Sequence, residues 1–106
     1  MLDLSVLAQE TLDIKLLDGE IVCIKNPSKG LLIELNKADL KMAQETDFEK
    51  MVEMLERITA KILSNNTSKK MFTAEQLEEL DIDYSLQTQI FKAYLEFVTK
   101  SLNNPN

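Results

Sequence analysis

The stretch Thr11–Lys25 reads TLDIKLLDGEIVCIK and decides the fold class, because alternating apolar residues stand on both sides of an Asp-Gly pair. Apolar and polar residues that alternate with a period of two are typical of a strand with one buried face. A two-residue loop made of Asp18 and Gly19 suits a tight turn, whose positive φ values glycine tolerates. The pattern therefore predicts a β-hairpin over residues 11–25, which Asn26-Pro27 ends because proline cannot continue the ladder.

The predicted two-residue loop sets the pairing between the strands. Leu16 would lie opposite Ile21, and Ile14 opposite Cys23, so that one face of the hairpin is apolar. The single Cys23 has no cysteine to pair with, and its place in this alternation predicts a small core residue rather than a reactive thiol. A lone hairpin is marginal in water, so we expect its apolar face to pack on helices or on another chain.

Helical periodicity takes over after the hairpin. In the first helical segment the apolar residues recur at helical spacing, at Leu31, Leu35, Ala38 and Met42. In the second, one face carries Phe48, Met51, Val52, Leu55, Ile58, Thr59 and Ile62. The predicted helices span residues 28–44, 47–64, 74–80 and 84–102.

Capping residues support three of these helix starts. Thr46 with Glu49, and Thr73 with Gln76, have the spacing of capping boxes. Asp83 is the predicted N-cap of the last helix. A chain of 106 residues is the size of one domain with one modest core. We therefore expect a single domain over residues 1–106, of class α+β and mainly α: an N-terminal hairpin followed by four helices packed as a small bundle.

Charge and hydropathy exclude several partners. With 12 Lys and Arg against 18 Asp and Glu, the formal net charge is −6, which disfavours nucleic acid and anionic lipid surfaces. The apolar runs are short, and the N-terminal MLDLSVLAQE has early acids without a basic region. We expect a soluble cytosolic protein with no membrane association.

The residues needed for common enzyme chemistry are missing. The chain has no His, which removes the commonest general base and a major zinc ligand. Its two glycines, Gly19 and Gly30, cannot make a glycine-rich nucleotide-binding loop. We predict no catalytic residues, no cofactor and no enzymatic activity.

A weak calcium-loop pattern starts at Asp81 and continues at Asp83 and Ser85. Its sixth position is Leu86 instead of Gly, and its twelfth is Lys92 instead of Glu. The capping role of Asp83 explains the pattern better, so we predict no metal site.

The stretch Asp81–Lys100 holds four of the six aromatic residues. On a helical wheel its apolar residues form two lobes that together span roughly 200°, about twice the width that one-sided packing requires. The helix is either central, sandwiched between the hairpin and the other helices, or it leaves one lobe for a partner. The Phe97 lobe contains Leu86, Ile90, Ala93 and Phe97; the Phe91 lobe contains Tyr84, Phe91, Leu95, Val98 and Leu102; Tyr94 lies between them.

We expect the Phe97 lobe to face outward, because it carries fewer large side chains and ends sooner than the Phe91 lobe. The predicted partner-binding residues are Leu86, Ile90, Tyr94 and Phe97.

Three stretches of the chain, taken in order, resemble the tail assembly chaperones of long-tailed bacteriophages of Gram-positive hosts. They are the N-terminal LDLSVL, the hairpin LDIKLLDGEIVCIKNPS and the closing LQTQIFKAYLEFV, with leucine-rich helices between them. The resemblance covers most of the chain as an order of features, without a catalytic signature.

The resemblance implies a non-enzymatic protein of virion morphogenesis that coats the tape measure protein and keeps it soluble until the tail tube polymerises. It implies action in the host cytoplasm and absence from the mature virion. This chain would correspond to the short form of the family, and a frameshift-extended form would recruit the tail tube protein. From the apolar surface left by the hairpin and one lobe, we also expect self-association.

The alternative is a small acidic regulatory or inhibitory adaptor protein of a phage or a bacterium, for example one that mimics nucleic acid. Mimicry requires ordered carboxylates spread over one surface, whereas the acids outside residues 75–83 are interleaved with Lys and Arg. The chaperone hypothesis is therefore the stronger one, and the acidic run at 75–83 is more simply a solvated face.

Overall fold

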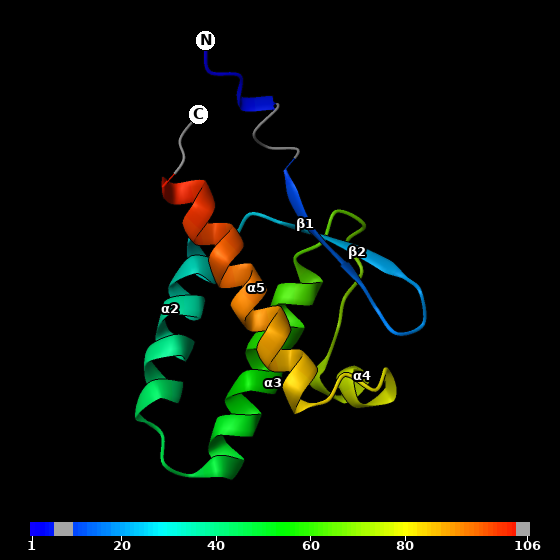
Figure 1. Ribbon diagram of the computed structural model, residues 1–106, viewed down its shortest axis with the longest axis vertical. Coiled ribbons are helices and arrows are strands. Elements are labelled where there is room, and N and C mark those ends of the chain that lie inside the picture. The colour runs from blue at the N-terminus through cyan, green and yellow to red at the C-terminus, as the bar shows by residue number, and fades with distance from the viewer. Residues whose placement is uncertain (6–9, 104–106) are drawn as a thin grey trace.

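The structure is a computed structural model that describes residues 1–5 and 10–103. Over these residues the chain forms a two-stranded antiparallel hairpin followed by four helices (Figure 1). The class is α+β and mainly α, as predicted, and no predicted helix bound differs from the observed one by more than one residue. Part of the LDLSVL segment falls on residues 6–9, which lie outside the described residues. The elements are β1 (Thr11–Lys15), β2 (Ile21–Lys25), α2 (Lys29–Gln44), α3 (Phe48–Ser64), α4 (Ala74–Glu79) and α5 (Tyr84–Asn103).

Helix α3 is the central element of the fold. It packs against α2, α4, α5 and β2, and in Figure 1 α5 crosses it while α2 runs along its side. A helix that contacts one neighbour buries a single stripe, but α3 buries side chains over a much wider arc. The interpretation of the last helix as the sandwiched element is therefore wrong, because α3 holds that position. The buried residues of α3 are Leu55, Ile58, Thr59, Ala60, Ile62 and Leu63.

The hairpin forms where predicted, but its register is shifted by one residue. Ile14 pairs with Val22 rather than with Cys23, because the loop has three residues instead of two. Leu16 N–H donates to Glu20 O at 2.8 Å, and Gly19 N–H donates back to Leu16 O at 2.9 Å. Gly19 has φ +92°, which suits a three-residue loop that ends in a left-handed residue.

The shift changes which residues of β2 face the core. Val22 and Ile24 are buried, whereas Ile21 is 61% exposed. A one-residue slip moves every side chain of a strand to the opposite face of the sheet. The predicted pairing of Leu16 with Ile21 is therefore wrong.

Cys23 lies on the outer face of the hairpin and is only half-buried, so the prediction of a core cysteine is also wrong. It pairs with Asp13 across the strands. A hydrogen bond to the Asp13 carboxylate raises the pKa of the Cys23 thiol. The Thr11 hydroxyl, 2.6 Å from the same carboxylate, and the Cys23 thiol lower the pKa of Asp13. The thiol is thus held in its protonated form.

Two of the three predicted caps are confirmed. Thr73 and Gln76 form the full capping box of α4, and Asp83 accepts the backbone N–H of Leu86 at 2.9 Å. The predicted cap at Thr46 is wrong: Asp47 caps α3 and accepts two backbone N–H groups of the first turn at 3.0 and 3.4 Å. A carboxylate there also interacts favourably with the positive end of the helix dipole.

The loop that follows α3 extends the sheet beyond β2. Lys25 N–H donates to Asn65 O at 2.9 Å, Thr67 N–H donates to Cys23 O at 3.0 Å, and Ile24 forms a bridge with Asn66. Strand β2 is therefore paired on both of its edges, and the hairpin is joined to the end of α3 by backbone hydrogen bonds.

Tyr94 of α5 closes the same junction from the other side. Its ring is fully buried, and its hydroxyl donates to Lys25 O at 2.7 Å and accepts from Asn65 Nδ2 at 3.2 Å. Asn65 Nδ2 also lies within hydrogen-bonding distance of Lys25 O and Asn26 O. A buried tyrosine whose hydroxyl finds polar partners combines a large apolar contact with a specific anchor. Tyr94 thus ties α5 to the ends of β2 and α3.

This burial predicts an alkaline loss of stability that depends on Tyr94. Burial raises the pKa of Tyr94 to about 12, above the value near 10 of an unfolded chain. The stabilisation is complete below about pH 10 and is lost as the pH rises toward 12, because only the unfolded chain then ionises easily. Urea unfolding at pH 9, 10 and 11 should show this decline, and a Tyr94→Phe variant should show a smaller one. An equal decline in both proteins would contradict the assignment to Tyr94.

Candidate partner-binding surfaces

Helix α5 buries the seam between the two predicted lobes rather than either whole lobe. Ile90 comes from the Phe97 lobe and Phe91 from the Phe91 lobe, yet both are buried. The outer edges of both lobes reach the surface, since α5 packs on α3 along one side. Over residues 84–101, whose side chains the structure describes, the buried residues of α5 are Gln87, Ile90, Phe91, Tyr94 and Val98. The side chain of Leu102, a member of the predicted Phe91 lobe, lies outside the described part of the chain.

The four predicted partner-binding residues divide between core and surface. Ile90 is 8% exposed and Tyr94 is fully buried, so both belong to the core. Leu86 is 36% exposed, and Phe97 is half-buried with its ring stacked on that of Tyr94 at a centroid distance of 6.0 Å. Of the four, only Leu86 and Phe97 are open to contact with another molecule, and partner binding there stays a prediction.

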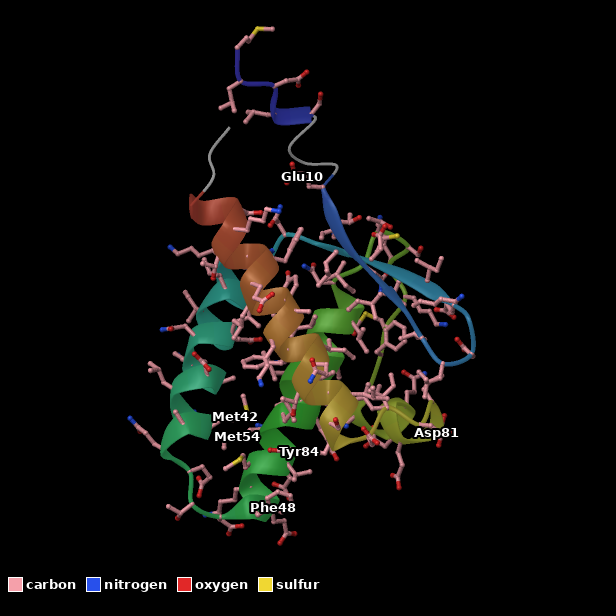
Figure 2. All side chains as sticks on the ribbon, viewed as in Figure 1. Glu10, Met42, Phe48, Met54, Asp81 and Tyr84 are labelled. Atoms are coloured by element: carbon pink, nitrogen blue, oxygen red, sulfur yellow. The ribbon has the colours of Figure 1, made fainter. Side chains whose placement is uncertain are left out.

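An exposed aromatic cluster lies where the N-terminal ends of α3 and α5 meet, and we call Phe48, Met51 and Tyr84 the aromatic patch. The rings of Phe48 and Tyr84 are 5.6 Å apart with an interplanar angle of 42°. The Tyr84 hydroxyl lies 3.7 Å from Met51 Sδ, as a weak donor to sulfur. Figure 2 shows Phe48 and Tyr84 next to each other at this end of the bundle. Phe48 is 66% exposed and Tyr84 39%, so the cluster is open to a partner.

Helical periodicity does not predict this patch, because it places Phe48 on the buried face of α3. Phe48 directly follows the cap Asp47, so it stands in the first turn, before the part of α3 that other elements cover. The position of Phe48 directly after a capping residue was the one feature of the sequence that could have indicated its exposure. Its meeting with Tyr84 depends on how α5 crosses α3, which periodicity does not predict.

Helix α2 exposes a second apolar surface. Its predicted stripe faces α3: Leu35 is buried and Met42 half-buried, and Figure 2 shows Met42 close to Met54 of α3. The rest of the helix is not polar, as an ordinary surface helix would be. Leu32, Ile33 and Leu40 are exposed.

The loop end of the hairpin is also apolar at the surface, where Leu17 of the loop and Ile21 of β2 are both exposed. Scattered exposed apolar residues are normal on any protein. What distinguishes the aromatic patch is that its side chains contact one another across two helices, which makes it a defined surface rather than isolated residues.

In the described part of the chain, no group of three or more His, Cys, Asp or Glu side chains could hold a metal ion. Over the same residues, no helix has the length and apolar character needed to cross a membrane. The ion pairs observed there are Lys61 with Glu34 at 2.9 Å and Lys70 with Glu20 at 2.7 Å, both at the surface.

Comparisons of this chain with protein-family models, with curated proteins and with solved structures found no match.

Proposed function

We propose that this chain is a non-enzymatic tail assembly chaperone of a long-tailed bacteriophage, which binds the tape measure protein and keeps it soluble until the tail tube polymerises. The order of hairpin and helices that carries the resemblance supports this proposal. A tape measure protein is a long helical molecule whose apolar seams aggregate when they are uncovered, and a small domain with apolar surface can cover such seams reversibly.

The observation that carries the proposal is the aromatic patch. Aromatic side chains dominate the binding energy of many protein interfaces, because they bury a large area at a small cost in conformational entropy. Phe48 and Tyr84 are exposed and in mutual contact, so a partner helix could cover both rings at once. The net charge of −6 would help to keep the complex soluble.

The proposal includes the finer expectations of the resemblance. The chaperone acts in the cytoplasm of the bacterial host and is absent from the mature virion. A frameshift-extended form recruits the tail tube protein, while this chain is the short form. The exposed Leu17 and Ile21 at the loop end of the hairpin favour self-association of the chaperone along the tape measure.

Co-expression with the tape measure protein of the same phage tests the proposal. We expect the wild-type chain to keep the tape measure protein soluble and to co-purify with it. A Phe48→Ser/Tyr84→Ser variant should co-purify about tenfold less, because aromatic anchors are removed from the interface. Circular dichroism should show both proteins folded, since the two side chains are exposed.

The matched control is Leu32→Ser/Ile33→Ser, which removes exposed apolar side chains from α2. This control should bind the tape measure protein as the wild type does. Loss of binding in the control alone would mean that the tape measure protein binds α2 rather than the aromatic patch. If the wild-type chain leaves the tape measure protein insoluble, the proposed function itself is wrong.

A further inference from the structure

A groove of about 550 Å³ adjoins the aromatic patch, between α3, α4 and the first turn of α5. Tyr84 belongs to both the patch and the groove, so a ligand in the groove can touch the patch as well. Val52 and Ile82 supply apolar parts of its lining. The volume is sufficient for a long side chain with part of the backbone that carries it.

Four carboxylates line this groove: Glu56, Glu78, Asp81 and Asp83. No Lys or Arg lines it, and the two ion pairs seen among the described residues involve other carboxylates. Asp83 caps α5, but Glu56, Glu78 and Asp81 make no side-chain hydrogen bond or ion pair within the described part of the chain. The groove is therefore a concentrated negative site without a cation of its own.

Gln87 gives an independent indication of the ligand. Gln87 is one of the lining residues and is only 5% exposed, and its Nε2 donates to Ile82 O at 2.9 Å. Its Oε1 is buried and has no hydrogen-bond partner. Because Nε2 is already engaged, the free atom is an acceptor, and leaving it unpaired costs free energy. An acceptor without a donor therefore lies in the wall of a groove whose other lining residues include four acids and no Lys or Arg.

Asp81 stands where stability alone would favour another residue. Its φ is +59°, a left-handed conformation that favours Gly or Asn, and it follows the C-terminal end of α4. A negative charge at that end of a helix is also unfavourable. Figure 2 shows Asp81 beside α4, and Asp81 is one of the residues that line the groove.

We propose that this groove binds the lysine or arginine side chain of an amphipathic segment in a partner protein, while apolar residues of the same segment cover the aromatic patch. A basic side chain supplies both missing features: positive charge for Glu56, Glu78 and Asp81, and N–H donors for the Oε1 of Gln87. The inference rests on the proposed function for the identity of the partner, whereas the preference of the groove for a cation does not.

The experiment uses the purified chain and two fluorescently labelled helical peptides of about 18 residues, long enough for five turns. Both carry leucine on one face; the other face is lysine in one peptide and glutamate in the other. Fluorescence anisotropy should show binding of the lysine peptide only. A Glu56→Gln/Glu78→Gln/Asp81→Asn variant should bind it about tenfold more weakly or worse, because charge-assisted contacts are lost.

The matched control is Glu53→Gln/Glu79→Gln/Glu96→Gln, which removes three exposed carboxylates that do not line this groove. It has the same net charge as the groove variant and should bind within about twofold of the wild type, since long-range attraction is largely screened in salt. The single Asp81→Asn variant should lose affinity while keeping or raising its melting temperature, because Asn tolerates a left-handed backbone.

Three results would overturn the inference. Equal weakening by both triple variants would mean that only the net charge matters. Equal binding of the glutamate peptide would mean that the surface selects apolar residues alone. A wild-type dimer that the groove variant converts to a monomer in sedimentation would make a second copy of this chain the occupant.

The outcomes also separate this inference from the proposed function. If the groove variant solubilises the tape measure protein as the wild type does, the chaperone function stands and the role of the groove is wrong. If the lysine peptide binds as expected while the tape measure protein stays insoluble, the chemistry of the groove stands and the function is wrong.

Discussion

A Phe91→Lys variant is expected to be unfolded at room temperature. Phe91 is 6% exposed in the core where α5 packs on α3. Replacing it removes a large buried ring, which costs about 3–5 kcal/mol in comparable cores. The lysine ammonium would add a further cost, because it has to be buried or deprotonated. A domain with a total stability of about 5–15 kcal/mol has little left after both losses.

Phe97→Lys is the matched variant on the same helix, and it is expected to fold. Phe97 is half-buried at the outer edge of its lobe, where a lysine stem can lie along Tyr94 while its ammonium reaches water. The lost ring contact is worth about 0.5–1.5 kcal/mol. Thermal unfolding followed by circular dichroism distinguishes the two variants. A folded Phe91→Lys protein would contradict the burial of the seam, and an unfolded Phe97→Lys protein would show that the core extends to the edge of the lobe.

The helices could be predicted from the sequence because their signals are local. The capping box of Thr73 and Gln76 and the cap at Asp83 need only residues within one turn of the helix start. The error at Thr46 has the same origin: two neighbouring residues, Thr46 and Asp47, can both cap, and the carboxylate accepts two N–H groups at once.

The hairpin shows where local signals become insufficient. Asp18-Gly19 fits both a two-residue loop and the last two positions of a three-residue loop, since each needs a left-handed glycine. The choice depends on which face of β2 is covered. Burial of Val22 and Ile24 on the helices favours the three-residue loop, and Leu17 becomes an exposed loop residue as a result. Periodicity alone does not determine which of the two loops forms.

The candidate partner-binding surface was the least predictable part of the molecule. A helical wheel shows that α5 has more apolar residues than one interface can bury, but it does not show where the interface is centred. The structure centres it on Tyr94, whose hydroxyl must reach Lys25 O and Asn65. That requirement turns the seam inward, so that Leu86 and Phe97 come to one edge and Tyr84 to the other, where it meets Phe48.

Among substitutions of polar residues, the largest loss of stability is expected at Asn66, which closes the loop after α3. Asn66 is 3% exposed; its Nδ2 donates to Leu63 O and to Lys70 O, both at 2.7 Å, and its Oδ1 accepts Lys70 N–H at 3.0 Å. Asn66→Asp keeps the shape but places a buried carboxylate against two carbonyl oxygens. We expect a loss of about 3–5 kcal/mol near neutral pH, as for a buried charge without its partner.

The pH dependence of this variant identifies the cause. Burial and the two facing carbonyls should raise the pKa of the new carboxyl group above its value near 4 in the unfolded chain. Stability should therefore be recovered below about pH 4 and lost as the pH rises through the higher folded-state pKa. The control is Asn36→Asp on the exposed side of α2, which makes the same change in charge and should stay within about 0.5 kcal/mol of the wild type. Urea unfolding from pH 3 to pH 7 compares the two. Equal stability of Asn66→Asp and Asn36→Asp across that range would mean that the side-chain hydrogen bonds of Asn66 to Leu63 and Lys70 do not stabilise the loop after α3.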